Sequence, residues 1–158
     1  MEKITHMVNK LLLGIAGLSL LLIVVVVTTN IVLRQVASSF GGVTEIVGWL
    51  TAVIVALSLA YSQQTKAHVE LDLLVGAFPE KAQEVIQVLL TVVSLLFFTL
   101  VAWRLWEYGY AAMTRESLSQ TLRVAYFPVV YLVALGFTAF CLVLLVDLVT
   151  DIKKAFAI

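Results

Sequence analysis

The sequence predicts an all-α integral membrane protein with four transmembrane helices. Four stretches are almost purely apolar, and each can cross a hydrocarbon core of about 30 Å, which takes about 20 helical residues. They are residues 11–33, 43–61, 85–103 and 124–146, with Glu45 as the only formal charge among them. Hydrophobic residues make up 62% of the chain and the mean hydropathy is +1.08, which is well above the values usual for soluble domains.

The first stretch could instead belong to a cleaved signal peptide. It follows Lys3 and Lys10, and Val36-Ala37-Ser38 loosely resembles a cleavage site. However, its apolar core is about twice as long as the 7–15 residues of a signal peptide. We therefore expect a retained helix.

The connection between the second and third stretches has its own pattern. Residues 68–74 alternate polar and apolar side chains, but an isolated strand beside lipid would leave its backbone unpaired. We expect a short interfacial segment there. Pro79 suits the first turn of the third helix, and Pro128 lies inside the start of the fourth. The expected architecture is a single domain, 1–158, with spans at about 11–33, 43–61, 82–106 and 124–148.

Basic residues predict the orientation. Four spans put both termini and the second connection on one side of the membrane. That side carries six lysines and the other carries four arginines: Lys3, Lys10, Lys66, Lys81, Lys153 and Lys154 against Arg34, Arg104, Arg115 and Arg123. Since cytoplasmic loops carry the excess of basic residues, both termini are predicted to be cytoplasmic.

Aromatic side chains gather near the predicted outer ends of the helices, where such rings favour the headgroup layer. The expected membrane-interface anchors are Trp49, Trp103, Trp106 and Tyr126. Ordinary anchoring accounts for most of these rings, and a docking surface on the outer face is the alternative for a minority.

Small residues recur every four positions in the second span, at Gly48, Ala52, Ala56 and Ala60. Lipid gives helices no hydrophobic drive to associate, so close approach over small residues is how they pack. The stripe predicts a helix-packing surface, either inside this chain or against another subunit.

Glu45 lies two residues inside the second span. We expect an interfacial ion pair with Arg34, which the intervening turn brings to the same depth, or with an arginine of a partner. A proton or ion relay is the alternative, since acidic residues within spans are often functional.

The sequence lacks the residues that several kinds of chemistry require. His6 and His68 lie outside the spans, so no histidine is available inside them as a haem ligand. No metal-ligand cluster, activated nucleophile or glycine-rich phosphate loop is present, and Cys141 has no second cysteine to pair with. Ten basic and ten acidic residues leave no net charge and no basic tract for nucleic acid. We expect no enzyme activity, no cofactor and no nucleic-acid partner.

An ordered set of landmarks resembles a known family. The landmarks are Asn30-Ile31-Val32-Leu33-Arg34, Glu45, His68-Val69-Glu70-Leu71-Asp72, Pro79, Thr121-Leu122-Arg123-Val124, Pro128, Tyr131 and Gly136. Their order over residues 10–150 is similar to the small, four-helix membrane subunit (DctQ-like) of tripartite ATP-independent periplasmic (TRAP) transporters. Where that family often has a second carboxylate beside the first, this chain has Thr44-Glu45-Ile46.

The resemblance implies a bacterial inner-membrane uptake system. In such systems a periplasmic binding protein captures an organic acid and delivers it to a two-part permease. The large membrane subunit holds the substrate and sodium sites, and the small subunit binds it and enlarges the fixed scaffold. Two alternatives are a stand-alone homodimeric transporter and a non-catalytic anchor or assembly subunit of another membrane complex.

Overall fold

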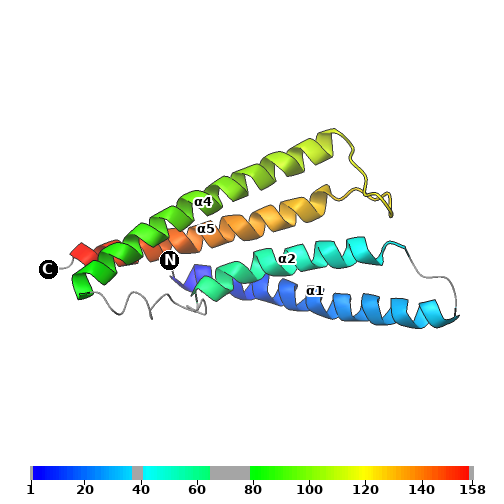
Figure 1. The fold of residues 1–158 in the computed structure, drawn as a ribbon, viewed down its shortest axis with the longest axis horizontal. Coiled ribbons are helices and arrows are strands. Elements are labelled where there is room, and N and C mark those ends of the chain that lie inside the picture. Colours follow the sequence, from blue (N-terminus) through cyan, green and yellow to red (C-terminus); the bar gives the residue numbers. More distant parts are fainter. Residues whose placement is uncertain (1, 37–40, 65–78, 157–158) are drawn as a thin grey trace.

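The computed structural model describes residues 2–36, 41–64 and 79–156, and this part of the chain is helical without β-strands. The helices are α1 (Glu2–Val36), α2 (Val43–Gln64), α4 (Glu80–Thr114) and α5 (Phe127–Phe156) (Figure 1). All four are long and apolar enough to cross a membrane, which confirms the predicted fold class. The interfacial segment predicted at 68–74 lies outside the described residues.

The four helices form an open row rather than a closed bundle. Packing runs from α1 to α2, from α2 to α5 and from α5 to α4, while α1 touches α5 only slightly. Figure 1 shows the same row, with α1 and α4 at its two edges. Each edge helix therefore has one principal neighbour and leaves much of its surface uncovered.

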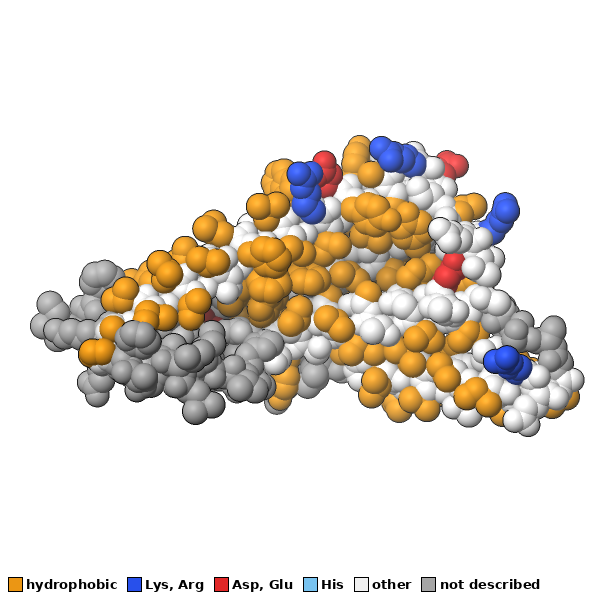
Figure 2. Space-filling model, in the orientation of Figure 1, with side chains coloured by type: hydrophobic (Ala, Val, Ile, Leu, Met, Phe, Trp, Pro, Cys, Tyr) orange, Lys and Arg blue, Asp and Glu red, His pale blue; other side chains and the backbone are white. Residues whose placement is uncertain are grey.

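Two clusters of buried apolar side chains fill the row. In the first, Ala16 of α1 meets Val53 and Leu57 of α2. In the second, Ala60 of α2 lies among Phe140, Val143 and Leu144 of α5, with Leu95 and Phe98 of α4 packed against them. Most large apolar side chains of α1 and α4 are instead exposed, as expected of surfaces that face lipid (Figure 2).

Helix α4 continues to Thr114, well beyond the predicted span end at 106. A compact turn then leads into α5, in which the backbone N–H of Ser119 donates to the Val124 carbonyl at 2.9 Å. Arg123 adopts a left-handed φ of 53° within this turn. The sequence predicts that this end of the row faces outward, so we call residues 115–126 the outer connection and the opposite end of the row the inner end.

Candidate functional site: the α2–α5 seam

The contact between α2 and α5, here called the α2–α5 seam, joins two halves of the chain. Because α1 packs mainly on α2 and α4 on α5, the seam fixes the α1–α2 pair relative to the α4–α5 pair. It has a close contact in its middle and a polar contact at each end.

In the middle of the seam the two backbones touch. A Cβ atom on Gly136 would lie 2.7 Å from the carbonyl carbon and oxygen of Ala56, so only glycine fits at this position. Ala56 and Ala60 are completely buried. This is the close approach over small residues that holds membrane helices together.

The predicted small-residue stripe is therefore divided. Its inner half, Ala56 and Ala60, packs inside the chain, whereas Gly48 and Ala52 are exposed. Nothing lies within 4 Å of a Cβ built on Gly48. A contact between this outer half and another subunit stays a prediction.

At the outer end of the seam, Glu45 binds the outer connection. Its Oε1 accepts a hydrogen bond from the backbone N–H of Thr121 at 2.7 Å, and its Oε2 accepts one from Leu122 at 3.1 Å. Gly42, just before α2, also packs against the outer connection, because a Cβ on Gly42 would overlap the side chain of Leu122. The carboxylate thus holds two neighbouring backbone donors, a charge-assisted arrangement that is stronger than neutral hydrogen bonds.

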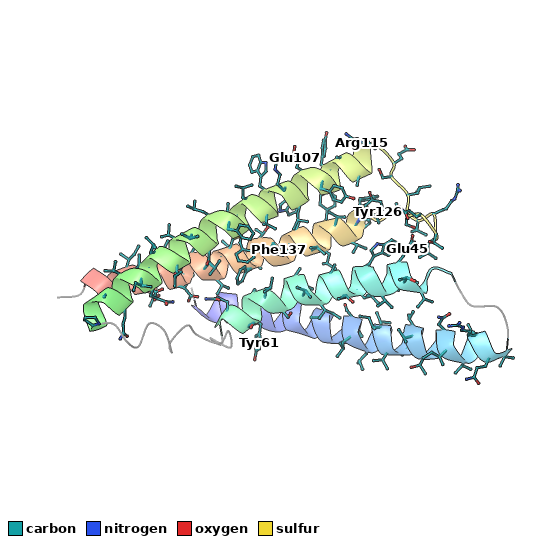
Figure 3. All side chains as sticks on the ribbon, viewed as in Figure 1. Glu45, Tyr61, Glu107, Arg115, Tyr126 and Phe137 are labelled. Carbon is teal, nitrogen blue, oxygen red and sulfur yellow. The ribbon has the colours of Figure 1, made fainter. Side chains whose placement is uncertain are left out.

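Arg34 is not among the partners of Glu45. Arg34 is exposed near the end of α1. Among the side chains that the structure describes, the one ion pair joins Arg104 Nη1 to Glu107 Oε2 at 2.9 Å. Both oxygens of Glu45 instead accept backbone N–H groups of the outer connection, and its ion pair with Arg34 stays a prediction. An arginine of a partner subunit stays a prediction. Figure 3 shows Glu45 at the start of α2, beside the outer connection.

At the inner end of the seam, two aspartates of α5 bind helices on either side. Gln63 Nε2 of α2 donates to Asp147 Oδ2 at 3.0 Å. One turn further, Thr91 Oγ1 of α4 donates to Asp151 Oδ2 at 3.3 Å. Sequence reasoning missed these contacts because both aspartates lie at or beyond the end of the predicted fourth span. Their spacing of four residues, which puts them on neighbouring turns, is the signal that could have found them.

The predicted aromatic anchors have different surroundings. Trp103 is exposed and Trp49 is half-buried. Trp106 packs on the Tyr131 ring, and its Nε1–H donates to Thr138 Oγ1 at 3.1 Å. The Tyr126 hydroxyl lies 3.1 Å from that of Tyr108. Their role as membrane anchors stays a prediction.

Together these contacts hold the helices in register. Among the described residues, no group of three or more His, Cys, Asp or Glu side chains is placed to hold a metal ion. Four apolar helices joined in this way define a multi-pass membrane protein. The family model for "Tripartite ATP-independent periplasmic transporters, DctQ component" matches residues 23–154. The chain belongs to this family, which is the small membrane component of TRAP transporters and works with a large membrane component and a binding protein. No curated protein and no solved structure matches it.

Proposed function

We propose that the chain is the small permease subunit of a sodium-driven TRAP transporter in a bacterial inner membrane, with both termini in the cytoplasm. It binds the large subunit, which holds the substrate and sodium sites, and enlarges the fixed part of the permease. The transporter takes up an organic acid delivered by a periplasmic binding protein. The family match over residues 23–154 is the observation that carries this proposal.

The open row of helices supports a scaffold role. Both edge helices expose large apolar side chains over many turns, and a larger membrane subunit can cover one such face. The α2–α5 seam holds the row together at its middle and at both ends. A layer held together at its centre, with an uncovered edge, suits a subunit that supports a moving partner.

Reconstituted transport tests this proposal. A thermal-shift screen of carboxylic acids on the companion binding protein would first identify the substrate. Uptake of that acid is then measured in liposomes under an inward sodium gradient. We expect uptake only when this chain, the large subunit and the binding protein are all present.

Two outcomes would contradict the proposal. Accumulation of the acid by this chain alone would favour the stand-alone transporter. Full uptake by the large subunit without this chain would remove the scaffold role.

A further inference from the structure

The helices of the row are offset along their length. Ala16 of α1 packs beside Val53 of α2. From there α1 continues to Val36, about 30 Å of helix at 1.5 Å per residue, whereas α2 continues only to Val43, about half that length. Helix α1 therefore projects beyond the outer end of α2 (Figure 1).

Helix α4 is offset in the opposite direction. Gln63, in the last turn of α2, binds Asp147 of α5, and Thr91 of α4 binds Asp151 one turn further in. From Thr91, α4 continues to Glu80, roughly 16 Å more. The inner end of α4 thus projects well past the inner end of α2 (Figure 1).

This offset puts a charged pair beside the middle of the row. Trp106 of α4 binds Thr138 of α5, and Gly136 of α5 packs on Ala56, near the middle of α2. Arg104 and Glu107 flank Trp106, and their side chains are 70% and 59% exposed. Figure 3 shows Glu107 on the side of α4 that faces away from α5.

A bilayer whose plane is perpendicular to the axes of α2 and α5 fits the positions of these charged and apolar side chains badly. Arg104 and Glu107 would face the middle of the bilayer, where each charge costs on the order of 2.5–3.5 kcal/mol on insertion scales. Meanwhile exposed apolar side chains at the outer end of α1, such as Val32, and at the inner end of α4, such as Leu89, would lie outside the hydrocarbon.

We infer that the bilayer crosses the row obliquely, with the helices tilted toward the upper part of the 0–40° range known for membrane helices. Two exposed apolar belts, Ile15–Val36 on α1 and Val85–Leu100 on α4, then lie within the hydrocarbon layer at the same depth. The same slant brings Arg104 and Glu107, with the neighbouring Trp103, to the outer headgroup layer. The inference concerns the depth of this chain's own residues, so it stands or falls separately from the proposed function.

Nitroxide labels at matched sites test the slant. In the full chain with Cys141→Ala, single cysteines replace Val32, Val93, Glu107 and Val55, and the protein is placed in phosphatidylethanolamine–phosphatidylglycerol nanodiscs. The three valines are between 51% and 57% exposed, close to the 59% of the Glu107 side chain. Accessibility to oxygen relative to a nickel chelate reports the depth of each label. Val55, near the middle of α2, is the control that lies deep for either orientation.

The oblique bilayer predicts an oxygen-to-nickel accessibility ratio at Val93 close to that at Val55, and an intermediate ratio at Val32, which lies about 6 Å from the end of its belt. Both ratios should exceed that at Glu107. A ratio at Glu107 as high as at Val55, or a ratio at Val32 or Val93 as low as at Glu107, would overturn the inference. If a variant does not fold, a label at a nearby site takes its place: Ile31 for Val32, Leu89 for Val93 and Arg104 for Glu107.

Discussion

At the residue scale, Glu45 is the clearest case of a side chain whose contacts depend on the tertiary fold. It lies in the first turn of α2, where a carboxylate is favoured by the helix dipole. Its two oxygens bind the backbone of Thr121 and Leu122, more than seventy residues away in the chain. Glu45 thus holds the outer connection to α2.

Glu45→Gln tests this contact. The amide keeps one acceptor oxygen but puts an NH₂ group opposite the other backbone N–H, so one hydrogen bond is lost. We expect a lower thermal midpoint in detergent and severalfold faster proteolysis within the outer connection. Glu107→Gln is the control, because an exposed ion pair within one helix contributes little to stability. Equal effects of the two variants would show that Glu45 does not hold the connection.

Gly136 and Gly48 form a second matched pair. Gly136→Ala would force the added methyl against the backbone of Ala56, and such overpacking costs typically 1–3 kcal/mol. Gly48→Ala adds the same methyl to open space. Unfolding in mixed micelles should therefore separate the variants, with only Gly136→Ala destabilised. Similar stabilities for both would mean that the close approach at Gly136 is absent.

At the scale of the helices, the sequence predicted where the helices lie along the chain better than which helices pack against each other. Long apolar stretches predict four helices because only a helix satisfies its own backbone in lipid. They do not predict that α5 packs between α2 and α4, because a helix that is apolar on every side has no polar face to mark its partner. The contacts of Gly136, Asp147 and Asp151 depend on that order. The four-residue spacing of the two aspartates marks them as neighbours, but their partners on α2 and α4 could not be inferred from the sequence.

The inner end of the seam gives a prediction for a pair of helices. A double-mutant cycle with Gln63→Leu and Asp147→Leu isolates their hydrogen bond. We expect a coupling of about 0.6 kcal/mol, the average for such bonds between membrane helices. The matched cycle of Gln63→Leu with Asp151→Leu should give a coupling near zero, because Asp151 binds Thr91 instead. The reverse order of the two couplings would contradict the contact seen here.

At the scale of the whole molecule, the chain is a thin layer rather than a closed bundle. A closed bundle could surround a polar pathway, whereas here α1 and α4 lie at opposite edges of the row. The DctQ family supplies the context, since its members act beside a large membrane component. The uncovered edge helices and the closely packed central seam agree with a chain that supports a companion.

Identifying the protein that copurifies with this chain, carrying an affinity tag, tests this account most directly. The chain is extracted from its native membranes in mild detergent, and the proteins that copurify at equal amounts are identified by mass spectrometry. The account predicts one larger, multi-spanning permease encoded beside this chain. Recovery of the chain with copies of itself alone, or with the subunits of a respiratory enzyme, would contradict it.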